Sequence, residues 1–249
     1  MQADSDAESN RIMKQTKPIF LCGLMGSGKS TVGRVLASKI GVPFVDLDEE
    51  IERKAGKTVS EIFAMQGEAR FRELERLVLM DCIECDTGVF ALGGGALQSR
   101  EIAEQVADAG TLVYLETSVD VLAERLLGDD SRPLLQGSVE PEQESHQPDK
   151  KTVQKEAKTR EIDGLNDFDT SRLEELKRLK ELKGRLQALQ DEREGLYLMA
   201  AVKICTDGVG PDVVANECMD RMDAMGRLAG WGATEESSLE QNEKEQYGE

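Results

Sequence analysis

Ile19-Phe20-Leu21-Cys22 is a short apolar run that ends directly at the glycine-rich stretch Gly23-Leu24-Met25-Gly26-Ser27-Gly28-Lys29-Ser30. The stretch matches G-x-x-x-x-G-K-[ST], and the residues after it predict a helix over 29–40. A buried strand before the loop and a helix after it form the setting in which such a loop binds phosphate. A chance glycine-rich turn is the alternative, and this setting disfavours it. The loop predicts nucleotide binding, while kinases, GTPases and motor ATPases all remain open.

The loop residues have separate expected roles. Glycines let backbone N–H groups face the phosphates, and the helix N-terminus adds its positive end. Lys29 is expected to reach the β- and γ-phosphates, and the Ser30 hydroxyl is placed for Mg²⁺. The residues expected to bind ATP here are Gly26, Ser27, Gly28, Lys29, Ser30 and Thr31.

Downstream of the loop, strand and helix patterns alternate along the chain. Further strands are predicted at 43–47, 88–92, 111–116 and 200–205, and further helices at 49–54, 59–66, 69–85, 99–109, 119–127 and 213–226. This alternation predicts an α/β fold with a parallel sheet covered by helices.

Two acidic residues close the second predicted strand. Asp46 and Asp48 are two apart, so a strand would place both carboxylates on one side, at the edge where open α/β sheets bind ligands. Asp46 could hold Mg²⁺ through water, and Asp48 could orient or partly deprotonate a substrate hydroxyl. The alternative is a helix N-cap beside a solvated carboxylate.

Two further groups suggest an anion site. Arg72 and Glu75 lie three apart on a predicted helix, where a guanidinium could clamp a carboxylate and Glu75 could hold its rotamer. An ordinary surface ion pair is the alternative. Gly93-Gly94-Gly95 follows a predicted strand and would let the backbone approach a ligand, or would serve only as a flexible turn.

The ordered set of phosphate loop, D-x-D, G-E-x-x-F-R-x-x-E, G-G-G, R-P-L-L and a late R-x-x-x-Y resembles the shikimate kinase family, over about residues 17–135 and 186–228. The resemblance implies a three-layer P-loop kinase fold like that of nucleoside monophosphate kinases, with a five-stranded parallel sheet, helices on both faces and a lid. It implies ATP-dependent phosphorylation of the shikimate 3-hydroxyl with Mg²⁺, in aromatic amino acid biosynthesis.

The resemblance also assigns roles. Lys29, Asp48 and Arg132 would be catalytic, with Arg132 of R-P-L-L reaching the transferring phosphate from the lid. Arg125 and the loop 206–211 would contact adenine, and Ser30 and Asp46 would hold the metal. The residues implied to bind shikimate are Asp48, Arg72, Gly93, Gly94, Gly95 and Arg193.

Two alternatives remain open. A gluconate kinase-like enzyme shares the loop and fold, but Arg72, the glycine triplet and Arg193 together favour a carboxylated substrate. A catalytically inactive regulatory homologue would explain an insertion longer than the family's lid, but it would not need Lys29, Asp48 and the arginines.

The chain is expected to divide into a disordered tail at 1–16, one domain at 17–230 and an acidic disordered tail at 231–249. Within the domain, 137–185 is assigned to a lid insertion and a leucine-striped helix. The stripe is formed by Leu173, Leu176, Leu179, Leu182, Leu186 and Leu189. It predicts a helix that packs on its own domain, and a coiled coil is the alternative.

Composition limits the class of protein. The 249 residues carry a net charge of −18, which disfavours binding to nucleic acid and to an anionic membrane surface. The five cysteines are too few for a disulfide scaffold. Cys82 and Cys85 form a C-x-x-C with no second pair, so structural thiols are favoured over zinc or a redox switch. A cytoplasmic monomer is expected, with the plastid stroma as the alternative if a transit peptide is missing.

Overall fold

The computed structural model describes residues 17–127 and 167–228. The strands are β1 (Ile19–Cys22), β2 (Phe44–Asp46), β3 (Val89–Ala91), β4 (Thr111–Glu116) and β5 (Val202–Cys205). The helices are α2 (Lys29–Ile40), α3 (Leu47–Ala55), α4 (Val59–Ile83), α5 (Arg100–Ala109), α6 (Val119–Leu126), α7 (Asp167–Tyr197) and α8 (Pro211–Ala224).

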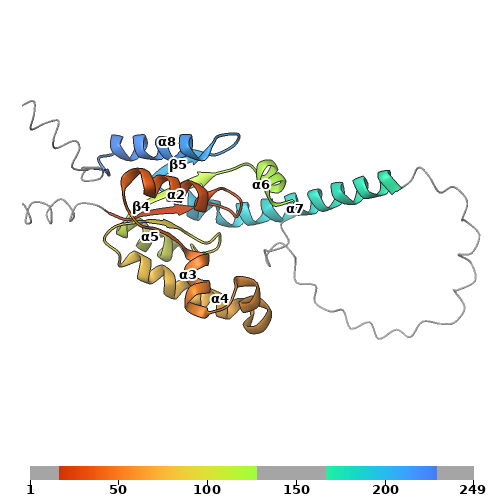
Figure 1. Ribbon diagram of the computed structural model, residues 1–249, viewed down its shortest axis with the longest axis horizontal. Coiled ribbons are helices and arrows are strands. Elements are labelled where there is room, and N and C mark those ends of the chain that lie inside the picture. The colour runs from red at the N-terminus through yellow and green to blue at the C-terminus, as the bar shows by residue number, and fades with distance from the viewer. Residues whose placement is uncertain (1–16, 128–166, 229–249) are drawn as a thin grey trace, which may run out of the picture.

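The five strands form one parallel sheet in the order β2-β3-β1-β4-β5. Helices α2 and α8 cover one face, and α4 and α5 lie against the other, so the molecule has three layers (Figure 1). The predicted α/β fold is confirmed. Because all strands are parallel, the loops that follow β1, β2 and β3 meet at one edge of the sheet.

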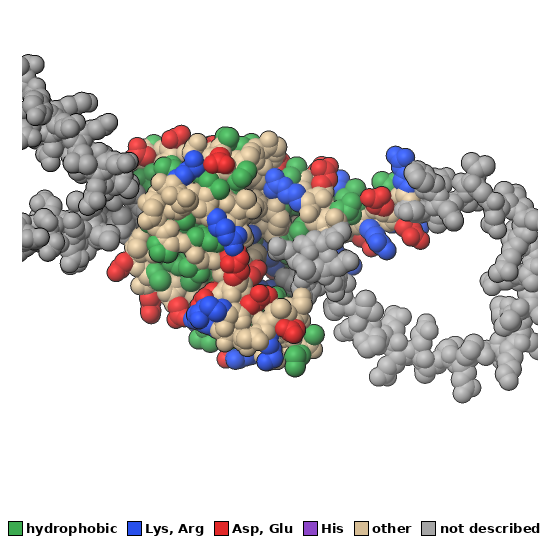
Figure 2. All heavy atoms as spheres, in the orientation of Figure 1, with side chains coloured by type: hydrophobic (Ala, Val, Ile, Leu, Met, Phe, Trp, Pro, Cys, Tyr) green, Lys and Arg blue, Asp and Glu red, His purple; other side chains and the backbone are tan. Residues whose placement is uncertain are grey.

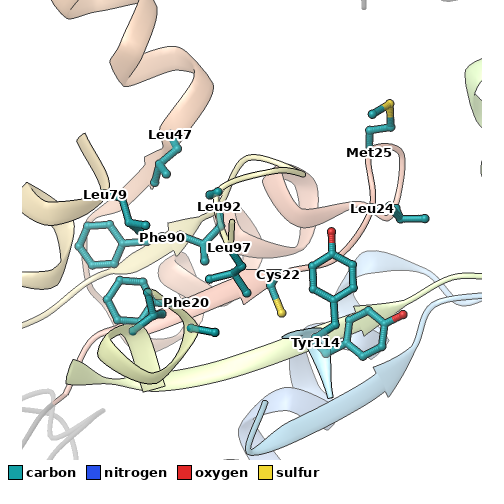
Figure 3. Packing of buried hydrophobic residues seen from close by; sticks show 14 of the residues in the cluster. Phe20, Cys22, Leu24, Met25, Leu47, Leu79, Phe90, Leu92, Leu97 and Tyr114 are labelled. Carbon is teal, nitrogen blue, oxygen red and sulfur yellow. The ribbon is translucent and has the colours of Figure 1, made fainter. Parts of the chain in front are cut away.

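Strand β1 shows how the sequence divides the core. Ile19 and Leu21 point into the apolar cluster under α2 and α8, whereas Phe20 and Cys22 point into the larger cluster on the opposite face. This period of two is what a strand buried on both faces requires. Figure 3 shows Phe20 beside Phe90 of β3, and their ring centroids are 5.3 Å apart.

The helix limits follow local signals. Ser99 caps α5 through its side chain, and Thr58 with Glu61 forms a capping box at the start of α4. The two helices predicted at 59–66 and 69–85 correspond to α4, whose backbone leaves the helical region at Gly67, with φ 79° and ψ 172°. A glycine adopts that conformation without steric cost.

Helix α7 packs on its own domain through its C-terminal half, as predicted. Leu186 is buried, and Leu179, Leu182 and Leu189 pack against the same core, but Leu176 is exposed. Leucines seven apart stay on one face of a helix, whereas repeated steps of three drift around it. The predicted single stripe is therefore wrong at Leu176. The first turns of α7 project beyond the sheet and the other helices (Figure 1).

Helix α7 contains the described part of the predicted segment 137–185. It runs without interruption from Asp167 to Tyr197, so residues 167–185 belong to the helix that carries Arg193. The predicted tails at 1–16 and 231–249, and positions 137–166 of the predicted insertion, lie outside the described residues. Within 17–127 and 167–228, no helix is both long and apolar enough to cross a membrane.

Candidate active site

The phosphate-binding loop joins β1 to α2. Gly26 and Gly28 have φ of 81° and 93°, and a Cβ at Gly23 would lie 2.6 Å from the Leu115 carbonyl oxygen. Lys29 is only 8% exposed, and its Nζ donates to the carbonyl oxygens of Gly23 and Leu24, both at 2.9 Å. The ammonium is therefore held over its own loop, where phosphate charge would lie.

The two predicted metal residues lie together. Ser30 Oγ donates to Asp46 Oδ2 at 2.5 Å, and the other oxygen of Asp46 accepts from the Asp48 backbone N–H at 3.0 Å. Asp46 thus ends β2 and caps α3. The predicted strand at 43–47 is too long by one residue at each end. Asp48 lies in the first turn of α3, so the period-two argument for its direction was wrong.

A cleft of about 600 Å³ connects these groups. Residues of the phosphate-binding loop line it, together with Asp46, Asp48, Arg125, Thr206 and Pro211. Its volume is within the range of small-ligand sites. Asp48 therefore lines the cleft as predicted, but it does so from the start of α3 and not from a strand.

The predicted adenine end is tied to the loop by hydrogen bonds. Arg125 of α6 donates from Nη1 to the Gly26 carbonyl at 3.0 Å and from Nη2 to the Thr206 carbonyl at 3.2 Å. The hydroxyls of Thr206 and Thr117 are 2.6 Å apart and buried. The loop after β5 is therefore fixed against both α6 and the phosphate-binding loop.

Arg72 is held by two carboxylates of α4. Its Nη1 donates to Glu75 Oε2 at 2.7 Å, and its Nε and Nη2 donate to Glu68 Oε1 at 3.3 and 3.1 Å. Glu75 is 1% exposed and also accepts from Gln98 Nε2 at 3.2 Å. Burial alone would lower the pKa of Arg72, but the Glu75 and Glu68 carboxylates outweigh it and raise that pKa. The guanidinium stays charged and oriented.

The glycine triplet provides space. A Cβ at Gly95 would lie 2.4 Å from Arg72 Nη1, and a Cβ at Gly93 would lie 2.6 Å from Glu75 Oε1 and 3.1 Å from Asp48 Oδ1. None of the three has a positive φ. The triplet therefore serves close approach of charged groups and not an unusual backbone conformation.

Helix α7 reaches the triplet from the other side. Arg193 is buried, and its Nη1 donates to the Gly94 carbonyl at 2.7 Å, while the Tyr197 hydroxyl donates to the same oxygen at 2.8 Å. The Tyr197 ring stacks on Tyr114, with centroids 5.1 Å apart. Burial raises the pKa of Tyr197, so it keeps its proton. Arg72 and Arg193, the two arginines predicted to bind the substrate, thus meet at the glycine triplet.

The sequence analysis gives no role to three residues of this cluster, although two of them stand in the quoted motifs. Tyr197 is one helical turn after Arg193, which places both on one face of α7, so the R-x-x-x-Y spacing could have indicated it. Glu68 lies four residues before Arg72, so the same helical spacing could have indicated their contact. Gln98 is 23 residues from Glu75, and no local signal joins them. Arg132 lies outside the described residues.

Three cations of the site are shielded from solvent. On the face that Figure 2 shows, acidic and basic side chains are interspersed over the described surface. Lys29, Arg72 and Arg193 are instead largely shielded, at 8%, 20% and 8% exposure. An acidic chain can in this way bind anions locally, because buried charges are screened far less than exposed ones.

The phosphate-binding loop on this parallel sheet, with paired carboxylates where β2 ends and α3 begins, defines a P-loop kinase fold. The model of the shikimate kinase family matches residues 25–179. The chain belongs to the shikimate kinase family. That membership confirms the resemblance. It also excludes a GTPase and a motor ATPase as interpretations of the phosphate-binding loop.

The similar proteins cover different parts of the chain. A shikimate kinase of Persephonella marina is 32% identical over 204 residues, which are 82% of this chain and 98% of the relative. A shikimate kinase of Prosthecochloris aestuarii is 48% identical over 125 residues, 50% of this chain, and the match spans only 64% of that relative. The structure of Acinetobacter baumannii shikimate kinase, solved in complex with shikimate, has 29% identity and a TM-score of 0.65, covering 87% of this chain and 97% of its own.

Proposed function

We propose that this chain is a shikimate kinase that transfers the γ-phosphoryl group of ATP to the 3-hydroxyl of shikimate, in aromatic amino acid biosynthesis. The observation that carries this proposal is the convergence of Arg72 and Arg193 on the glycine triplet, beside Asp48 and the nucleotide cleft. Two shielded guanidiniums at one end of a phosphate-binding site suit a substrate that carries a carboxylate.

The acceptor hydroxyl would lie at Asp48. The Asp48 carboxylate lines the cleft and is near Gly93, so it is placed between the arginine pair and the phosphate-binding loop. A carboxylate there accepts a hydrogen bond from the hydroxyl and directs its oxygen at the γ-phosphorus. The new O–P bond forms as the bond to the β,γ-bridging oxygen breaks, which releases ADP, and the hydroxyl proton passes to the Asp48 carboxylate and then to solvent.

Lys29 would stabilise the transferring group. Its ammonium is held against the loop at two carbonyl oxygens, so it is already oriented before the nucleotide binds. A preorganised cation needs no reorganisation as charge develops in the transition state. Removal of this charge should therefore reduce turnover more than it reduces binding.

Mg²⁺ is expected with ATP, and the donors fit it. Ser30 Oγ and Asp46 Oδ2 are hard oxygen ligands at the phosphate end of the cleft. Within the described residues, no cluster of three or more His, Cys, Asp or Glu could hold a metal ion by itself. Such a cluster is not needed, because Mg²⁺ usually takes only one or two protein ligands and completes its shell with phosphates and water. When bound, it would neutralise phosphate charge, and Ser30 and Asp46 would place it.

Four further assignments belong to this proposal. Arg132 would act on the transferring phosphate from the lid, and Arg125 with the loop after β5 would contact adenine. Residues 17–230 would work as one domain, with the lid between α6 and α7. The protein would act as a monomer. Arg125 already bonds to the Gly26 carbonyl, which supports its placement beside the nucleotide.

A coupled ADP-release assay with shikimate, with gluconate and without an acceptor tests the activity. Shikimate-dependent ADP production is expected. Gluconate-dependent production would favour the sugar-acid kinase alternative, and no production with either acceptor would favour an inactive homologue. Arg72 and Arg193 argue against the first alternative, and the placed Lys29 argues against the second.

A further inference from the structure

Arg72 binds its two carboxylates through different edges of the guanidinium. Nη1 is committed to the buried Glu75 and lies against Gly95, so the Nη1/Nη2 end is already occupied. The Nε/Nη2 edge, with two parallel N–H groups, is held by a single oxygen of Glu68. Two parallel donors are the geometry in which a guanidinium grips a carboxylate. Glu68 therefore occupies the edge that best suits a substrate carboxylate.

The two carboxylates differ in how easily they can leave. Glu75 is 1% exposed and has a second donor in Gln98, and a buried charge that loses its partner is strongly destabilised. Glu68 is 58% exposed, so water can replace Arg72 at little cost. Glu75 is thus a permanent partner of Arg72, and Glu68 an exchangeable one.

The backbone at Glu68 gives its side chain another favourable position. The helical path of α4 breaks at Gly67 and resumes with Glu68, so Glu68 lies in the first turn of the resumed helix. Negative charge is favourable near a helix N-terminus. The carboxylate can therefore leave Arg72 without losing all electrostatic stabilisation.

We propose that Glu68 is a competing carboxylate that the substrate's own carboxylate displaces from Arg72. This inference rests on the proposed function, because it concerns the same anion site. Binding then exchanges one anion for another at the Nε/Nη2 edge. A neutral polyol cannot make this exchange, so Glu68 contributes to the selection of carboxylated substrates.

The test is Glu68→Gln in the full chain, with shikimate affinity measured by titration calorimetry in the absence of nucleotide. The matched control is Glu73→Gln, because Glu73 is also on α4, is 61% exposed and pairs with Arg70 at 2.6 Å, away from Arg72. Both variants remove one surface carboxylate. Since a partly exposed ion pair is weak, Glu68→Gln should lower the Kd for shikimate about two- to fivefold, and Glu73→Gln should leave it unchanged.

Several outcomes overturn the proposal. An unchanged Kd in Glu68→Gln, with cooperative melting like the control, means that Glu68 does not compete. A raised Kd means that Glu68 positions Arg72 for the substrate. Failure of all three proteins to bind shikimate, with no shikimate-dependent ADP release by the unmodified chain, refutes the proposed function and the exchange with it. If the unmodified chain binds shikimate normally, a result against Glu68→Gln refutes only the role of Glu68 and not the proposed function.

Discussion

Gly95→Ala directly tests the anion site, because this glycine lies against Arg72. The added Cβ would lie 2.4 Å from Nη1, 2.9 Å from Cζ and 3.0 Å from Nη2 of Arg72, whereas ordinary contacts begin at 3.4 Å. The guanidinium must therefore move by roughly 1 Å to relieve the overlap. Because it is the end of a long side chain, it can move without the backbone, and we expect the variant to fold.

The displacement of the Arg72 guanidinium determines how much the KM for shikimate rises. The Arg72–Glu75 hydrogen bond is 2.7 Å long, and a displacement of this size takes it beyond good hydrogen-bond geometry. The displaced guanidinium would also lose a charged hydrogen bond to the substrate carboxylate, and such a bond contributes about 1.5–3 kcal/mol. The KM for shikimate should therefore rise about tenfold to a hundredfold. ATP binding should be unaffected, because Arg72 does not line the nucleotide cleft.

The assay is coupled ADP release with shikimate and ATP varied separately, beside thermal melting. Gly184→Ala is the control, because a Cβ there meets nothing within 4 Å and the residue is in α7. That control should keep both KM values and gain up to about 1 kcal/mol in stability. A Gly95→Ala protein that melts cooperatively and keeps its KM for shikimate would refute the placement of the substrate carboxylate at Arg72.

Three further predictions use other contacts. Lys29→Ala should lower kcat by at least about a hundredfold, and near-normal turnover would contradict the phosphoryl-transfer role. Tyr197→Phe removes a hydrogen bond to the Gly94 carbonyl and should cost about 1 kcal/mol, measured as a drop in Tm, while an unchanged Tm would mean that the bond contributes nothing. Burial raises the pKa of Cys82 to about 12, and partial burial with nearby carboxylates also raises the pKa of Cys85, so the two thiols differ mainly in exposure. Iodoacetamide followed by mass spectrometry should therefore modify the exposed Cys85 before the buried Cys82. Equal labelling of both cysteines would contradict that burial.

Much of the fold could be predicted because it depends on local signals. The helix at 29–40 has the predicted limits, since a glycine-rich loop opens it and Gly41 closes it in a left-handed conformation. The strand at 111–116 also has the predicted limits. The error at Asp48 arose at a boundary, where the Asp46 side chain caps α3 and ends β2 earlier than the strand pattern suggests.

The leucines of α7 show where a local pattern is insufficient. Spacings of three and four predict a helix, and α7 is one, but the spacing does not say which leucines meet the core. Leu186 is buried in the core cluster, whereas Leu176 is exposed. Repeated steps of three turn Leu176 away from the buried leucines, and only the packing of α7 on the domain shows which side of the helix is buried.

The sequence by itself determined the phosphate-binding loop, the order of strands and helices, and the residue types available to bind an anion. The loop and the order of elements follow from interactions between neighbours in the chain, which set backbone conformation and helix limits, and the residue types are read from the sequence directly. Only the tertiary structure decided that Gly95 lies against Arg72, and that Tyr197 bonds to the carbonyl of Gly94, 103 residues away. Contacts at such separations depend on how helices pack on the sheet, because no local conformational preference joins the two partners.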